Sequence, residues 1–158
     1  EGIIGELRQN EPGREIDVVI QPNLHVHGDQ RLIHDLLRNL IANAWKFTSK
    51  KQRARIEIGL AAPGTLATLF IRDNGAGFDL AHAKRLFKPF VRLHTAADYE
   101  GSGLGLATVA RIVERHGGKI WAEATVNEGA TFYFTLPTTP MTGEFVRQHK
   151  APEPAASV

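Results

Sequence analysis

The sequence DQRLIHDLLRNLIANAWKFT, residues 29–48, predicts one long amphipathic helix around which the chain is organised. Its apolar residues recur at steps of three and four, the spacing of a helix with one buried stripe. These residues are Ile33, Leu36, Leu37, Leu40, Ile41, Ala44 and Phe47. Asn39 and Asn43 lie one turn apart beside this stripe, and Lys46 follows three residues later. Because amides are costly to bury without partners, the two asparagines either cap a neighbouring loop or line a polar pocket.

Turn and cap signals divide the rest of the chain into short elements. Proline and glycine pairs mark the turns between alternating apolar and polar stretches, and Asp29 is placed to cap the long helix. The predicted elements are a helix end over residues 1–9, strands over 15–20, 24–27, 55–60, 66–73, 119–125 and 130–136, a short helix over 80–86 and a helix over 108–116. This order predicts an α/β fold, a two-layer α/β sandwich whose mixed or antiparallel sheet carries helices on one face.

Asp73 ends the strand predicted over residues 66–73. It falls on the same face as Ala67, Leu69 and Ile71, so its carboxylate is aimed inward at the end of an apolar row. Asp-Asn-Gly is also a strong turn sequence, in which the aspartate caps its own turn. Both interpretations stay open at this point.

Two glycine clusters bracket a long segment without regular periodicity, residues 75–105, which is typical of a functional lid or of disorder. The second cluster, GSGLGL at residues 101–106, runs straight into a helix, where free backbone N–H groups and the helix dipole favour a phosphate. It is not a P-loop, since no Gly-Lys-Ser/Thr follows, nor a dinucleotide fingerprint, since no strand directly precedes it. Alone, the cluster also fits an ordinary structural turn.

Composition excludes several classes of function. The formal net charge is +2 with both signs interspersed, so we expect no nucleic-acid partner. The chain has no run that would span a bilayer and no signal sequence, and the absence of cysteine excludes disulfides and thiolate metal sites. We therefore expect a cytoplasmic location.

The chain is expected to have three parts. Residues 1–13 would be the end of a preceding helical region or a linker, residues 14–137 one folded domain, and residues 138–158 a tail or linker rich in Pro, Ala and Thr. The first residue is Glu1 and not Met, which suggests a piece of a longer protein.

Five motifs occur in a fixed order: NLIANAWKFT at 39–48, DNGAGF at 73–78, LFKPFVRL at 86–93, GSGLGLA at 101–107 and GATFYFTLP at 129–137. Together they resemble the ATP-binding catalytic domain of sensor histidine kinases, within the GHKL group of ATPases, and are most similar to its phytochrome-like subset. The resemblance covers roughly residues 14–137. It implies the GHKL (Bergerat) fold with a long ATP lid, and ATP and Mg²⁺ as cofactors.

The resemblance implies a role for each matching residue near the phosphates. Asn43 would coordinate the Mg²⁺ that bridges them, Asn39 would lie one turn earlier in the same pocket, and Lys46 would contact a phosphate. Arg92 would approach the γ-phosphate or the partner. At the other end, Asp73 would accept a hydrogen bond from the adenine amino group.

Further motif residues are implied to hold the nucleotide or its lid. Gly75 and Gly77 would let the adenine ring pack against the backbone, with Thr131 beside the ring. Phe87 and Phe90 match the F-box that anchors the lid. The other implied nucleotide contacts are Phe47, Gly101, Ser102, Gly103, Leu104 and Gly105.

Two departures from the family pattern stand out. Asn127 replaces a glycine usually found two residues before Gly129; asparagine tolerates the left-handed region, so we expect the turn to survive. The family phosphorylates a histidine on a preceding helical hairpin, which this sequence lacks. His34 is followed by Asp35, as an acceptor histidine often is by an acid, but it lies on the helix face opposite the two asparagines and is not the expected acceptor.

The expected function is transfer of the γ-phosphate of Mg-ATP to a histidine on a separate dimerisation hairpin, in cis or in trans. A response regulator receiver domain is a further expected partner, with the full-length protein a homodimer and the fragment a monomer. The alternatives are an ATP-hydrolysing module of the gyrase or chaperone type and a degenerate nucleotide-binding module. Hydrolytic relatives carry a glutamate at the position of Asn39, an amide that cannot act as a base, which favours transfer over hydrolysis.

Overall fold

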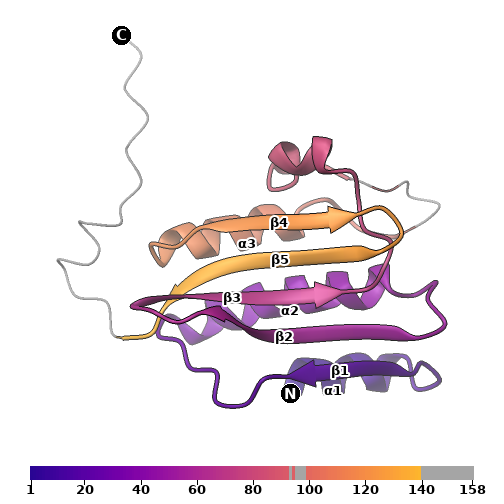
Figure 1. Cartoon of the computed structure of the whole chain (residues 1–158), viewed down its shortest axis with the longest axis horizontal. Coiled ribbons are helices and arrows are strands. Elements are labelled where there is room, and N and C mark those ends of the chain that lie inside the picture. Colours follow the sequence, from indigo (N-terminus) through magenta and orange to yellow (C-terminus); the bar gives the residue numbers. More distant parts are fainter. Residues whose placement is uncertain (93, 95–98, 140–158) are drawn as a thin grey trace, which may run out of the picture.

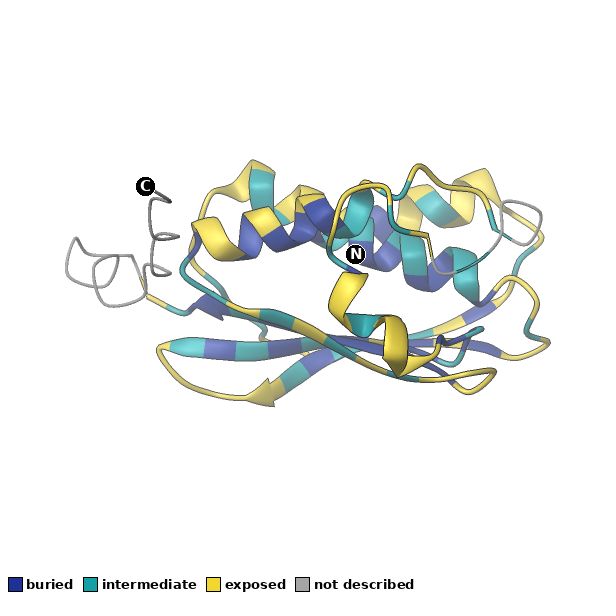
Figure 2. Ribbon diagram, turned by 90° about the horizontal axis from the view of Figure 1, so that it is seen from above, coloured by how far each residue is buried: buried dark blue, intermediate teal, exposed yellow. Residues whose placement is uncertain are grey.

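The computed structural model describes residues 1–92, 94 and 99–139. In this part of the chain, five strands form one mixed sheet, and three α-helices cover one of its faces (Figure 1 and Figure 2). The strand order is β1-β2-β3-β5-β4; β1 is parallel to β2, and the other pairs are antiparallel. The elements are α1 (Gly2–Asn10), β1 (Ile16–Ile20), α2 (Gln30–Phe47), β2 (Ala54–Ala62), β3 (Leu66–Asp73), the 3₁₀ helix η1 (Leu80–Arg85), α3 (Gly105–Arg115), β4 (Ile120–Thr125) and β5 (Gly129–Pro137). The predicted two-layer α/β sandwich is confirmed.

Both ends of α2 are closed by side chains. Asp29 Oδ1 accepts hydrogen bonds from the Arg31 and Leu32 N–H groups at 2.9 and 3.1 Å, which confirms the predicted cap. At the other end, the buried Thr48 Oγ1 donates to the Ala44 carbonyl at 2.8 Å. The buried stripe of the helix consists of Leu36, Leu40, Ile41, Ala44 and Trp45. The stripe packs against the sheet, so the orientation of α2 about its own axis is set by burial.

The central strands β3 and β5 turn alternate residues toward the helices. On β3 the buried residues are Ala67, Leu69, Ile71 and Asp73. Opposite them on β5 lie Leu136, Phe134, Phe132 and Ala130. The alternation confirms that the Asp73 carboxylate ends a buried apolar row.

Helix α1 packs against α2, and its Ile3 and Ile4 belong to the same core as the sheet residues. The division at residue 13 between a preceding region and the catalytic domain stays a prediction. Neither α1 nor any other helix in the described ranges is long and apolar enough to cross a bilayer.

Two segments differ most from the sequence-based expectation, while the other elements shift by at most two residues at their ends. Residues 24–27 do not form a strand; they cross the end of the sheet from the edge strand β1 toward β5, where the His27 N–H donates to the Pro137 carbonyl at 2.7 Å. These four residues, which alternate between apolar and polar, therefore run across the end of the sheet and do not form a strand of it. Helix α3 begins at Gly105 and not at Thr108, because the end of the glycine cluster joins its first turn.

The turn between β4 and β5 has a left-handed residue at Asn127, with φ 65°, as expected. The Asn127 N–H donates to the Ala76 carbonyl at 2.7 Å, and its own carbonyl accepts from Lys51 Nζ at 2.6 Å. The turn thereby supports the segment that follows Asp73.

We expect Asn127→Val to lower the free energy of unfolding by about 1–2 kcal/mol, because a β-branched side chain is strained at positive φ. The matched control Asn127→Gly should change it by less than about 0.5 kcal/mol, since glycine adopts this conformation freely. Urea unfolding of both variants beside the wild type measures the difference. Equal losses in the two variants would contradict a backbone origin of the effect.

Candidate active site

A cavity of about 250 Å³ opens between α2, the glycine cluster before α3 and the inward face of β5. From α2, its wall contains Asn39, Asn43, Lys46 and Phe47. From the glycine cluster and the start of α3, it contains Glu100, Gly101, Ser102, Gly103, Gly105 and Leu106. The other wall residues are Gly77, Phe78, Leu86, Val91, Arg92, His94, Tyr99, Ala130 and Phe132. Residues of all five sequence motifs therefore meet at one cavity.

The two asparagines of α2 present their carboxamides differently. Asn39 Nδ2 donates to the Asp35 carbonyl at 2.8 Å, within the helix. Its oxygen faces the start of α3, since a Cβ built on Gly105 would lie 2.7 Å from Asn39 Oδ1. Among the described residues, the Asn43 carboxamide has no hydrogen-bond partner in the protein, so it is free for a ligand in the cavity.

Two cations face the same cavity. Burial lowers the pKa of the half-buried Lys46 ammonium, and the nearby Arg92 guanidinium lowers it further, while Glu100 acts in the opposite direction. Arg92 Nη2 donates to the Tyr99 carbonyl at 2.6 Å. A Cβ on Gly101 would lie 3.1 Å from Lys46 Nζ, so the glycine gives the ammonium access to the cavity. Two positive charges in the wall of one cavity favour an anion between them.

The start of α3 adds backbone donors to this anion site. Helix α3 begins after Leu104 without a side-chain cap across its first turn, and Ser102 Oγ accepts only a long hydrogen bond, of 3.4 Å, from the Leu104 N–H. The preceding turn is closed by Gly103, with φ 76°, whose carbonyl accepts from the Phe90 N–H at 3.0 Å. Unsatisfied N–H groups at a helix N-terminus bind phosphates well.

Asp73 lies just behind the cavity wall. It is 5% exposed, its Oδ1 accepts from the Gly75 N–H at 2.8 Å, and it pairs across the sheet with the wall residue Ala130. Burial raises the pKa of the Asp73 carboxyl to about 6, against the lowering effect of the Gly75 and Ala130 backbone groups. The carboxylate thus caps its own turn, and its cross-strand neighbour Ala130 lies in the cavity wall.

Gly77 closes the wall beside Asp73. It has φ 59°, and a Cβ on it would fall 2.0 Å from the Thr125 carbonyl oxygen. A side chain at this position is therefore excluded by both conformation and space. Gly75 is not itself a wall residue, but a Cβ there would meet the Phe47 carbonyl oxygen at 2.4 Å.

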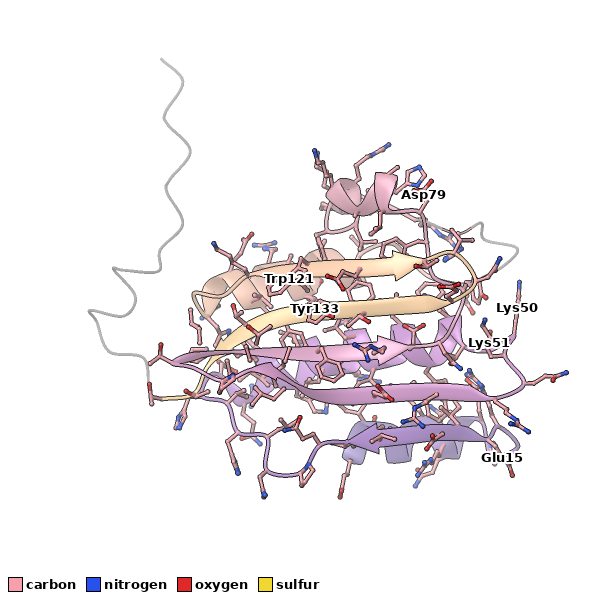
Figure 3. The ribbon with its side chains drawn as sticks, in the orientation of Figure 1. Glu15, Lys50, Lys51, Asp79, Trp121 and Tyr133 are labelled. Atoms are coloured by element: carbon pink, nitrogen blue, oxygen red, sulfur yellow. The ribbon has the colours of Figure 1, made fainter. Side chains whose placement is uncertain are left out.

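Thr131 does not lie beside the cavity, and this expectation was wrong. Its Oγ1 accepts from Arg72 Nε at 3.2 Å on the other face of the sheet. That face, which the helices leave uncovered, also carries the stacked rings of Trp121 and Tyr133 (Figure 3). Because side chains alternate along a strand, the wall residue is the preceding one, Ala130.

The two F-box aromatics behave differently. The Phe87 ring packs edge-on against Phe132 of β5, with centroids 6.4 Å apart. Phe90 is 76% exposed with φ 64°, and it holds the glycine cluster through its backbone N–H and not through its ring. Neither residue is in the cavity wall, and the partly exposed Leu104 is also outside it.

Several wall residues were missed by the sequence reasoning. The strand alternation of β5 would have identified Ala130 and Phe132. His94 and Tyr99 have no such signal, because they lie in the segment without periodicity; their rings contact the Phe47 ring at 5.1 and 5.0 Å. Residues 93 and 95–98 of this segment, including the end of the F-box motif, lie outside the described residues.

No group of three or more His, Asp or Glu side chains that would hold a metal occurs in the described part of the chain. The free Asn43 carboxamide is a donor in the cavity that suits Mg²⁺, a hard cation that prefers oxygen and keeps several of its waters. A single protein oxygen fits an ion that arrives with a phosphate ligand. The donor set is therefore compatible with Mg²⁺ carried by a nucleotide.

Comparison with known proteins gives a consistent result. The chain is similar to cyanobacterial phytochrome A of Nostoc sp. (strain PCC 7120), at 40% identity over 134 residues, which are 85% of this chain and 17% of the phytochrome. It is also 40% identical over 125 residues to the adaptive-response sensory kinase SasA of Prochlorococcus marinus subsp. pastoris, covering 78% of this chain and 33% of that protein. The chain thus spans a minor part of these relatives.

Solved structures with the same fold include histidine kinase domains. The catalytic domain of histidine kinase ThkA superposes with a TM-score of 0.72 at 29% identity, over 88% of this chain and 91% of that one. The mycobacterial sensor histidine kinase MprB gives a TM-score of 0.71 at 28% identity, over 89% and 93%. Residues 28–140 match the family described as histidine kinase-, DNA gyrase B-, and HSP90-like ATPase. The chain belongs to this ATPase family, as a catalytic domain of the histidine kinase type.

Proposed function

We propose that residues 14–137 bind Mg-ATP and present its γ-phosphate to a histidine on a separate helical hairpin of the same kinase. The observation that carries this proposal is the meeting of the Asn39 and Asn43 carboxamides, the Lys46 and Arg92 cations and the uncapped start of α3 at one cavity. Carboxamide, cation and backbone N–H donors together suit a triphosphate with its metal ion.

The nucleotide is proposed to lie with its adenine at β3 and its phosphates at α2 and α3. The Asp73 carboxylate accepts a hydrogen bond from the adenine amino group, while Gly77 and Ala130 let the ring approach the backbone. Phe47 supplies a ring beside the base. The reverse orientation of the nucleotide is disfavoured, because a phosphate next to the buried Asp73 carboxylate would be repelled.

Asn43 Oδ1 is the proposed protein ligand for Mg²⁺. When bound, this ion would neutralise charge on the phosphate oxygens. Lys46, Arg92 and the backbone N–H groups of residues 103–105 hold the triphosphate, so that the terminal phosphate is presented in one orientation. In phosphoryl transfer such positioning and charge neutralisation account for most of the catalysis.

Transfer to a partner is favoured over hydrolysis by Asn39. Its carboxamide nitrogen donates within the helix and its oxygen faces α3, and an amide has no titratable proton acceptor. Any general base would therefore come with the acceptor histidine. A hydrolysing ATPase is the second candidate, and the family to which the chain belongs includes such enzymes.

The proposed partners follow from the kinase interpretation. They are the phosphoacceptor hairpin, in cis or in trans, and a response regulator receiver domain; the longer protein would act as a homodimer in the cytoplasm. The relative SasA is described as a sensory kinase, which supports this context.

Nucleotide binding tests the orientation. Asp73→Asn should weaken ATP binding by about 10–100-fold, because its amide donors would face the adenine amino group. Asn43→Ala should leave adenosine binding unchanged and remove the strengthening of ATP binding by Mg²⁺. Isothermal titration calorimetry measures both. Tight ATP binding by the Asp73 variant would contradict the adenine assignment.

The buried Asp73 carboxyl should lower the free energy of unfolding of the nucleotide-free domain. The pKa of Asp73 is raised to about 6 in the folded state from an ordinary value of 3.8, so ionisation above pH 6 disfavours the fold. Asp73→Asn should therefore raise the free energy of unfolding of the nucleotide-free domain by about 1–3 kcal/mol at pH 7. The gain should shrink as the pH falls from 6 to 4. Chemical unfolding across this pH range measures it, and a variant less stable than wild type at pH 7 would be the contrary result.

Turnover separates kinase from hydrolase. With Mg-ATP alone the domain should release no phosphate above the buffer rate, whereas adding a separately purified histidine hairpin should yield acid-labile phosphohistidine. Radiolabelled γ-phosphate follows both products. Sustained phosphate release without the hairpin would favour the hydrolase, and no Mg-ATP binding at millimolar concentration would indicate a degenerate module.

A further inference from the structure

The imidazole of His116 joins the end of α3 to the start of α2. The residue is 4% exposed and directly follows α3. Its Nδ1 lies 2.8 Å from the Ile112 carbonyl, and its Nε2 lies 3.1 Å from the Asp29 backbone N. A carbonyl can only accept and a backbone N–H can only donate, so Nδ1 carries the proton and Nε2 accepts. The ring is therefore held as one neutral tautomer.

The chain before α2 is shaped to receive this ring. A Cβ built on Gly28 would lie 2.5 Å from His116 Cδ2 and Nε2, so a side chain there would displace the imidazole. Asp29 uses its carboxylate to cap the first turn of α2 and its backbone N–H to bind His116. The N-cap residue of α2 and the C-cap residue of α3 thus share one contact.

A second contact between the two helices lies in the cavity. Asn39 Oδ1 faces Gly105 at the start of α3, whereas Asp29 contacts His116 at its end. The helices are therefore antiparallel, and the contacts are about 15 Å apart along α2, at a rise of about 1.5 Å per residue. Two contacts at this separation oppose sliding of α3 along α2. The His116 contact is the one outside the cavity.

We propose that His116 is a positioning residue for the phosphate end of the nucleotide site. By fixing how far α3 extends along α2, it sets the distance from the N–H groups of residues 103–105 to Asn43 and Lys46. This inference rests on the proposed binding of ATP in the cavity. The adenine end depends instead on Asp73 and Ala130, which belong to β3 and β5 and are paired within the sheet.

The test compares ADP with adenosine, because only ADP reaches α3. In His116→Leu both hydrogen bonds of the ring are lost, and we expect ADP affinity to fall about tenfold, the effect of a small misplacement of binding groups. Adenosine affinity should stay within about twofold, since none of its proposed contacts lies on α3. His116→Gln keeps an acceptor for the Asp29 N–H and should recover most of the ADP affinity. His25→Leu, at an exposed position, is the matched control.

Calorimetric titration of ADP and of adenosine into the folded variants gives the ratio of the two affinities. A loss shared equally by ADP and adenosine, or no loss of either, would overturn the positioning role, because a purely structural role gives no selective effect. If the wild type binds neither ligand, the proposed function itself fails. Wild-type ¹⁵N NMR of His116 gives a check that needs no variant: protonated Nδ1 and unprotonated Nε2 are expected, and the opposite tautomer would contradict the contact.

Discussion

The burial of one stripe of α2 is the constraint on which the rest of the site depends. Leu36 and Leu40 are at most 1% exposed, and Trp45 is 2% exposed, so rotating the helix would expose large apolar surface. The neighbouring edge of the same helix carries Asn39 and Asn43. Because a helix is rigid across its few turns, packing on the sheet side determines where the carboxamides point on the cavity side. The two asparagines that interrupt the apolar pattern of the sequence therefore line the cavity.

Asp73 shows the same coupling on the sheet. The alternation that buries Ala67, Leu69 and Ile71 also buries this carboxylate, which raises its pKa to about 6. Burying a carboxylate at the end of a strand disfavours folding, and a purely structural turn would be served as well by asparagine. A charged acceptor suits the proposed ligand, whose adenine amino group would donate to it. The site therefore combines one costly buried anion with a separate cluster of cations and N–H donors near α3.

Much of this arrangement could be predicted from the sequence, because it follows local periodicity. Most of the stripe of α2, the inward face of β3 and the left-handed Asn127 depend on neighbouring residues alone, whereas the buried Trp45 was not in the predicted stripe. The prediction that Thr131 lies beside the cavity was wrong, because a shift of one residue along a strand moves the side chain to the other face of the sheet. The predictions for Phe90, whose ring is exposed, and for a strand at residues 24–27 were wrong. Both segments are held by hydrogen bonds to residues that are distant in the sequence. His94 and Tyr99 could not be found, since nothing local marks a ring that packs on another element.

The central claim is that the carboxamide edge of α2 holds the metal-bound phosphates. Replacing Mg²⁺ by paramagnetic Mn²⁺, which takes similar oxygen ligands, tests it directly. As Mn²⁺ with ADP is added to the ¹⁵N-labelled domain, the Asn43 side-chain NH₂ signal should broaden first, followed by that of Asn39 and the backbone amides of Gly103 and Gly105. Broadening centred on another part of the protein, with the Asn43 signal unchanged, would contradict the account.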